Sequence, residues 1–74
     1  MVSTVEIGKR LRKLRGEKTL QNVSDATGLG VSALTMYELG QRMPRDEAKL
    51  ALACYYGLTI DELFFNPDFT KRED

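Results

Sequence analysis

The sequence predicts an all-α protein, a compact bundle of five short helices. Apolar residues recur at the three- and four-residue spacing of amphipathic helices in several short stretches. Most of these stretches end at a glycine or just before a proline, the residues that commonly stop a helix. No stretch gives a credible β-strand, and 74 residues limit the chain to a single small domain.

The first helix is expected over about residues 4–15. Ser3 or Thr4 can cap its start, and Gly16 marks its end. Its apolar side is formed by Val5, Ile7, Leu11 and Leu14. Lysine and arginine occupy the remaining faces of this helix.

The second and third helices are separated by the short connector Gly28-Leu29-Gly30. Thr19 has the position of an N-cap for the second helix, which stops at Gly28 because glycine readily adopts positive φ. The third helix is expected from about Val31 to Leu39, with Leu34 and Tyr37 directed inward. Two short helices joined by such a turn have the spacing of a helix-turn-helix, whose second helix enters the major groove of DNA.

Two further helices complete the bundle. The fourth begins near Pro44 and ends at Gly57, and its single cysteine, Cys54, is expected to be a small buried core residue. The fifth begins at the capping box Thr59-Ile60-Asp61-Glu62 and ends at Asn66-Pro67. We therefore predict a domain over residues 1–66 and a short polar tail over residues 67–74.

The composition excludes several classes of protein. With one cysteine and no histidine, the chain cannot build a Cys/His zinc site or a histidine-based catalytic triad, and no nucleophile, base and orienting group can be assembled. We expect no enzyme activity, metal, cofactor or small-molecule ligand. No apolar run is long enough to span a membrane and no signal peptide is visible, which predicts a cytoplasmic protein.

The charges are unevenly distributed although the net charge is zero. Residues 1–18 contain six basic and two acidic side chains, a local net charge of +4, whereas the part from Asp46 onward is acidic overall. One basic side is typical of an oriented nucleic-acid-binding protein. The alternative interpretation is a solvated helix face that is simply rich in lysine and arginine.

Two segments carry a resemblance to a known family. Residues 19–44, TLQNVSDATGLGVSALTMYELGQRMP, resemble the helix-turn-helix of phage repressor and Cro proteins, the XRE family. The later segment LALACYYGLTIDELFF resembles the closing helices of the same family. The resemblance extends from about Ile7 to Phe65 and implies a lambda-repressor-like fold that binds double-stranded DNA.

The resemblance also implies roles for individual residues. The positions that read base edges correspond to Val31, Ser32, Ala33, Thr35 and Met36. The positions that hold DNA phosphates correspond to Thr19, Gln21, Gln41, Arg42 and Arg45. Arg15 and Glu38 correspond to a salt bridge between the first and third helices. Because no lysine or arginine occurs in residues 19–41, base readout is expected to depend on Ser32, Thr35 and contacts with thymine methyl groups.

These features predict a sequence-specific DNA-binding transcriptional regulator, a repressor, that acts as a homodimer on a two-part operator. The dimer interface is expected at the C-terminal end, formed by Leu58, Phe64, Phe65 and Phe69. The opposing interpretation is that Phe64 and Phe69 fold back into the core of a monomer. The alternative function is a protein-interaction adaptor or antitoxin-like module that retains the fold but binds DNA weakly or without specificity.

Overall fold

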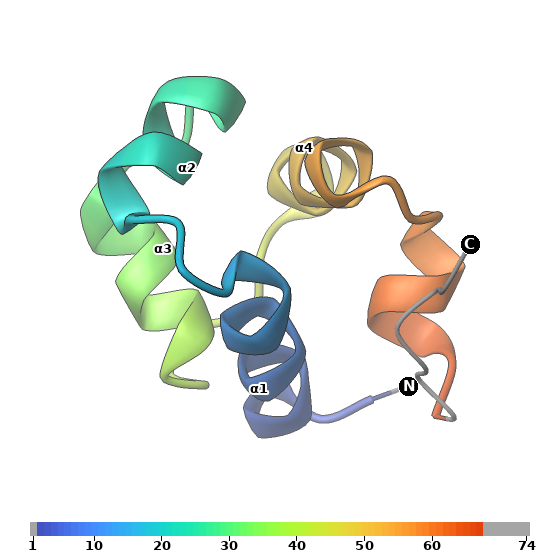
Figure 1. Ribbon diagram of the computed structural model, residues 1–74. Helices are drawn as coiled ribbons and strands as arrows, with labels where there is room; N and C mark the ends of the chain where they lie inside the picture. Colours follow the sequence, from blue (N-terminus) through green and yellow to red (C-terminus); the bar gives the residue numbers. More distant parts are fainter. Residues whose placement is uncertain (1, 68–74) are drawn as a thin grey trace.

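The computed structural model describes residues 2–67 and contains four α-helices followed by a short π-helix (Figure 1). The elements are α1 (Thr4–Arg15), α2 (Leu20–Thr27), α3 (Val31–Glu38), α4 (Asp46–Tyr56) and η1 (Asp61–Phe65). No strand occurs among the described residues. The predicted all-α, five-helix architecture is therefore confirmed, with helix ends within two residues of those expected.

Side chains cap three of the five helices. The hydroxyl of Ser3 accepts a hydrogen bond from the Glu6 amide at 3.1 Å, and that of Thr19 accepts one from the Asn22 amide at 3.0 Å. At the fifth helix, the Glu62 carboxylate accepts from the Thr59 amide at 2.9 Å, and the Thr59 hydroxyl accepts from the Glu62 amide at 3.0 Å. These bonds satisfy amides that a helix start leaves without a partner inside the helix.

The helices form two groups around α1. In Figure 1, α2 and α3 lie together on one side, α4 and η1 lie on the other, and α1 lies between them. The core contains apolar residues from all five elements, and its largest fully buried side chains include Ile7, Leu11, Val23, Leu52, Leu63 and Phe64. α1, together with a direct contact between α2 and α4, therefore joins the helix-turn-helix pair to the C-terminal part of the domain.

Backbones of α1 and α3 approach closely at Gly8. A Cβ atom at this position would lie 2.5 Å from the carbonyl oxygen of Glu38 and 2.7 Å from that of Tyr37. A second close contact follows at Gly40, whose φ is 74° and whose added Cβ would lie 2.9 Å from the Cα of Val5. At Gly8, glycine is required because there is no space for a Cβ atom. At Gly40, it is required both by lack of space and by the positive φ.

Two expectations about the C-terminal half are corrected by the structure. Cys54 is exposed on α4 rather than buried, because it lies on the side of the helix that also carries the exposed Leu50 one turn earlier. Phe64 is fully buried and belongs to the core, so it offers no surface to a second subunit. Tyr55 and Tyr56 pack against the core as partly buried side chains.

Substituting Gly8 by alanine is expected to destabilise the domain by about 1–3 kcal/mol. Alanine is intrinsically better than glycine inside a helix, but the added methyl group overlaps backbone atoms that cannot move without separating α1 from α3. Urea denaturation followed by circular dichroism measures the change. As a control, Gly30→Ser introduces a Cβ that meets no atom within 4 Å at a helix N-cap, and should leave stability unchanged or slightly higher. Equal stability of Gly8→Ala and the parent would contradict the close contact.

Candidate nucleic-acid interface

The connector between α2 and α3 is fixed by local hydrogen bonds. Gly28 adopts a left-handed conformation with φ 79°, and its amide donates to the carbonyl of Ser24. The Thr27 hydroxyl donates to the Val23 carbonyl at 2.7 Å and accepts from the Leu29 amide at 3.2 Å. The turn that orients α3 relative to α2 is therefore held by side-chain and backbone bonds together.

The inner side of α3 is anchored in the core and its outer side is available for contact. Leu34 and Tyr37 are buried, as expected. Of the five residues expected to read bases, Ser32 and Met36 are exposed, whereas Val31, Ala33 and Thr35 are half-buried. Ala33 packs against the core, so its contribution to an outer surface is small.

Several polar side chains of the α2–α3 unit already form hydrogen bonds within the protein. The Thr35 hydroxyl donates to the Val31 carbonyl at 2.9 Å, and the Gln21 amide donates to the Asp25 carboxylate at 2.9 Å. Thr19 uses its hydroxyl as the α2 cap. On the exposed surface of α3, the Ser32 hydroxyl forms no hydrogen bond with a described residue.

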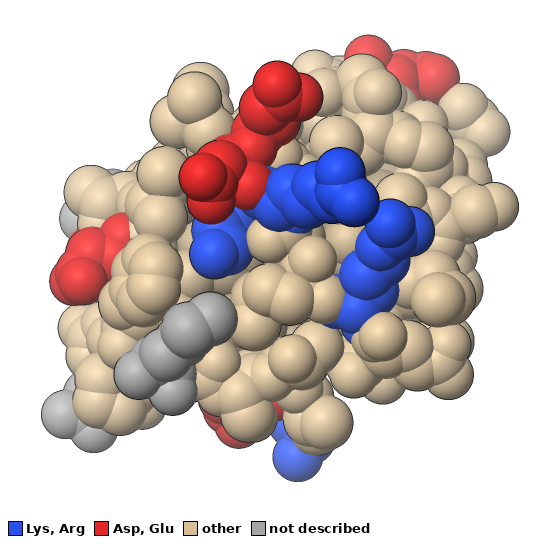
Figure 2. Space-filling model, turned by 180° about the vertical axis from the view of Figure 1, so that it is seen from behind, with Lys and Arg blue, Asp and Glu red and all other residues tan. Residues whose placement is uncertain are grey.

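Two arginines flank this unit after α3. Gln41, Arg42 and Arg45 are exposed in the segment between α3 and α4, and neither arginine forms an ion pair with a described residue. The face opposite to that of Figure 1 carries several lysine and arginine side chains near its middle, with acidic side chains directly beside some of them (Figure 2). Cations at the margin of an uncharged helix surface are suited to holding phosphates beside the bases.

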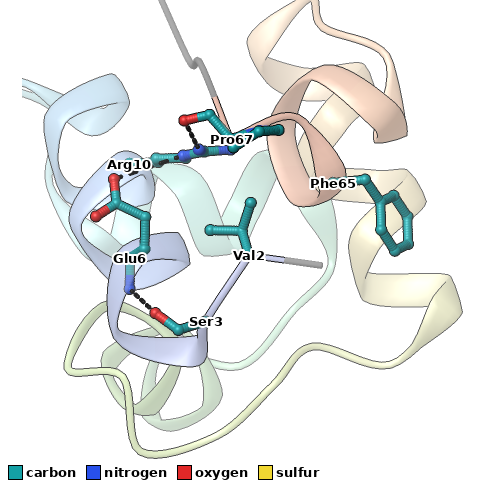
Figure 3. Close-up of a pocket in the computed structure, with 6 residues that line it drawn as sticks. All are labelled: Val2, Ser3, Glu6, Arg10, Phe65 and Pro67. Atoms are coloured by element: carbon teal, nitrogen blue, oxygen red, sulfur yellow. Dashed lines mark hydrogen bonds and ion pairs between the residues drawn. The ribbon is translucent and has the colours of Figure 1, made fainter.

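Arg10 does not belong to the basic side, contrary to the charge count of residues 1–18. Its side chain is only 2% exposed and donates to the Leu63 carbonyl at 3.0 Å. It also donates to the Pro67 carbonyl at 3.3 Å (Figure 3). Its Nε lies 3.7 Å from the Glu6 carboxylate. Lys9, Arg12 and Lys13 are the exposed bases of α1. Arg10 therefore links α1 to η1 and to Pro67, the first residue of the predicted tail.

Arg15 and Glu38 form the bridge between α1 and α3 that was expected. The Arg15 Nε lies 2.8 Å from Glu38 Oε2, and Nη2 lies 3.1 Å from Oε1, a bidentate pair. The side chains are 14% and 11% exposed, respectively. The hydrogen bond to Glu38 raises the pKa of Arg15, and Arg15 also donates to the Lys18 carbonyl at 2.7 Å. Nearby, burial and then the charge of Glu38 raise the pKa of Tyr56 to about 12.

A sequence model of the family described as helix-turn-helix matches residues 9–63, which span the whole α2–turn–α3 unit and most of the chain. The chain belongs to the helix-turn-helix family of XRE type. No curated protein and no solved structure matches it. The family consists of DNA-binding regulatory domains rather than enzymes, so this helix-turn-helix domain is a DNA-binding regulator of the XRE type.

Two further properties of the helix-turn-helix domain concern what its described residues contain. Of the helices that the structure describes, none is long and apolar enough to cross a membrane. Across residues 2–67, no three histidine, cysteine, aspartate or glutamate side chains are grouped so that they could hold a metal ion.

The roles of Gly8, Leu39 and Arg10 depend on how the helices pack, and the sequence did not predict them. Gly8 gives one signal, a glycine in the middle of a helical pattern, which often indicates close packing. Leu39, directly after the last residue of α3, is 62% exposed. It comes seven residues after Ser32 and three after Met36, so it lies on the same exposed side of the helix. The burial of Arg10 has no signal in the local sequence, because the carbonyls that accept its hydrogen bonds are more than fifty residues away.

Substituting Arg15 by alanine is expected to destabilise the helix-turn-helix domain by about 2–3 kcal/mol, because the Glu38 carboxylate then lacks its partner in a largely buried position. Thermal and urea denaturation measure the effect. Arg12→Ala, which removes an exposed arginine from the same helix, should change stability by no more than about 0.5 kcal/mol. Equal effects of the two substitutions would mean that the bidentate pair contributes nothing to stability.

Proposed function

We propose that this protein is a sequence-specific transcriptional repressor that inserts α3 into the major groove of double-stranded DNA. The observation that carries the proposal is the α2–turn–α3 unit itself. Its turn is fixed by Gly28 and Thr27, its second helix is anchored by Leu34 and Tyr37, and its outer side is open. An α-helix presented in this way fits the width of the major groove.

The surrounding residues supply the contacts that position such a helix. Arg42 and Arg45 follow α3 and are exposed, as cations that approach the phosphate backbone must be. The start of α2 provides backbone amides at the positive end of an eight-residue helix, near Thr19 and Gln21. We assign phosphate binding to these two ends of the unit and base reading to the α3 surface between them.

Repression follows from occupancy in this proposal. A small domain that binds tightly at a promoter excludes other proteins from the same stretch of groove. No separate effector domain is needed for that action, because the level of the protein sets the fraction of occupied sites. We place the protein in the cytoplasm, where it has access to DNA.

One observation favours a second candidate function, a protein-interaction adaptor or antitoxin-like module. The outer side of α3 carries Met36 and Leu39, 37% and 62% exposed, and no cation. Exposed apolar side chains on a helix also suit a protein partner. We favour DNA because Arg42 and Arg45 follow α3 in the chain and are exposed, and because the chain belongs to a DNA-binding family.

Selection from a library of genomic DNA fragments is expected to recover fragments that share one palindromic sequence. The purified protein is mixed with the fragments at physiological salt, and bound DNA is sequenced. Recovery of such a site supports the repressor. Random recovery at low and physiological salt would contradict sequence-specific binding and favour the adaptor.

Arg42→Ala and Arg45→Ala should each weaken DNA binding about equally for specific and random duplexes. Removing one phosphate contact should also reduce the slope of log affinity against log salt concentration by about one. Arg42→Lys is the matched control, because it keeps the charge and therefore the slope. A changed base preference in the alanine variants would instead show that these arginines read the groove.

We further propose that the repressor binds as a homodimer, because one recognition helix contacts too few base pairs to select a site in a genome. The proposed surface is formed by Leu58, which is half-buried, and Phe65, which is 40% exposed. Phe65 also lines an open pocket with Val2 and Pro67 (Figure 3). Phe69, the remaining residue expected there, lies outside the described residues.

Phe65→Asp is expected to convert a dimer into a monomer, because it removes the aromatic ring from the interface and places a carboxylate in apolar surroundings. Analytical ultracentrifugation at micromolar protein measures the oligomeric state. Leu50→Asp places the same charge on exposed α4 outside the proposed surface, and should leave the dimer intact. Dissociation by Leu50→Asp alone would move the interface to α4.

A further inference from the structure

The outer side of α3 carries few groups that could form hydrogen bonds with a base pair. Ser32, Met36 and Leu39 follow one another at helical spacing along the exposed side, with Val31 and Thr35 half-buried beside them. The helix contains a single charged residue, Glu38, and this carboxylate is held by Arg15. Bidentate readout of guanine or adenine requires an arginine, lysine, asparagine or glutamine side chain. None of these residues occurs on α3.

The remaining hydrogen-bonding groups of the unit are largely occupied. The Thr35 hydroxyl uses its proton in the bond to the Val31 carbonyl. The Gln21 amide donates to Asp25, and the other amide side chains of this region, Asn22 and Gln41, lie on α2 and after α3 rather than on α3. Ser32 alone presents an exposed hydroxyl on α3, and one hydroxyl can bond to either a donor or an acceptor and so discriminates bases poorly.

The apolar groups of α3 have one complementary feature in the major groove. The C5-methyl group of thymine is the only apolar group that a base edge presents there. The Met36 side chain is long, unbranched and 37% exposed, and can therefore cover such a group. Cations for the flanking phosphates are available at Arg42 and Arg45. Apolar readout is thus combined with the charges that hold a duplex in place.

We infer that α3 recognises its DNA site through the C5-methyl groups of pyrimidines, with Met36 and Val31 as the specificity-determining residues. The inference rests on the proposed DNA-binding function and names what that surface reads. It has a second consequence, because 5-methylcytosine presents the same methyl group at the same place. Methylation of a cytosine whose C5 position contacts Met36 or Val31 therefore strengthens binding.

The test begins with a random duplex library, from which the full chain selects its preferred site. Each thymine of the selected site is then replaced, one at a time, by deoxyuridine, which lacks only the methyl group. At the positions read by α3, affinity should fall about three- to fivefold per methyl, the factor expected from exposing one methyl-sized group to water. At the same positions, a duplex with 5-methylcytosine should bind more tightly than one with cytosine by a similar factor.

Variants locate the effect on the protein. Met36→Ala should reduce affinity for the thymine duplex and abolish the difference between thymine and deoxyuridine at one position, and Val31→Ala should do so at another. Leu50→Ala, which shortens an exposed apolar side chain on α4, should leave both affinity and difference unchanged. Circular dichroism checks that the variants fold, so that a lost difference reports on the contact.

The outcomes separate this inference from the function on which it rests. A selected site whose thymines can all be replaced by deoxyuridine without loss of affinity overturns the methyl readout but leaves sequence-specific binding intact. So does a deoxyuridine effect that persists unchanged in both Met36→Ala and Val31→Ala. Failure of the library to converge on any site overturns the proposed function together with this inference.

Discussion

The contact between α1 and α3 is the constraint on which the arrangement of the domain depends. At Gly8 the backbones are so close that a single methyl group would overlap two carbonyl oxygens of α3. The bidentate bond between Arg15 and Glu38 holds the same two helices further along α1. The first contact fixes their separation and the second fixes their rotation. Because α2 is attached to α3 by the bonded turn, the orientation of the whole pair follows from these two contacts.

This scaffold leaves the outer side of α3 free of structural duties. Leu34 and Tyr37 account for its packing, and Glu38, its single charged residue, is used inside the protein. Residues such as Ser32 and Met36 can therefore vary without loss of the fold, which suits a surface that sets specificity. The same separation of duties explains how an XRE-type domain retains its architecture although its outer residues include none of the arginine, lysine, asparagine or glutamine side chains that read bases by bidentate hydrogen bonds.

Local signals in the sequence were sufficient for most of the fold. Thr19, Gly28 and the Thr59–Glu62 capping box each act within one turn of chain, and the structure has the bonds that these residues predict. Errors arose where the outcome depends on distant chain. The charge pattern of residues 1–18 predicts Arg10 to be a surface base, but its side chain is buried and donates to carbonyls of η1 and Pro67. Cys54 is exposed although the sequence predicts it to be buried, and Phe64 is buried although the sequence predicts it at a dimer interface. Composition alone does not define which side of a helix faces the core. The assignment of DNA contacts to residues stays a prediction.

The Arg10 guanidinium also has a consequence for how the chain acquires its structure. Glu6, on α1 itself, lies 3.7 Å from its Nε, whereas its two carbonyl partners lie 53 and 57 residues further along the chain, so this set of partners is complete only when η1 and Pro67 have been made. Until then α1 carries an arginine that is stable in water and costly to enclose. A growing chain on the ribosome is therefore expected to collapse only after Pro67 has emerged. The domain should then fold as one cooperative unit rather than helix by helix.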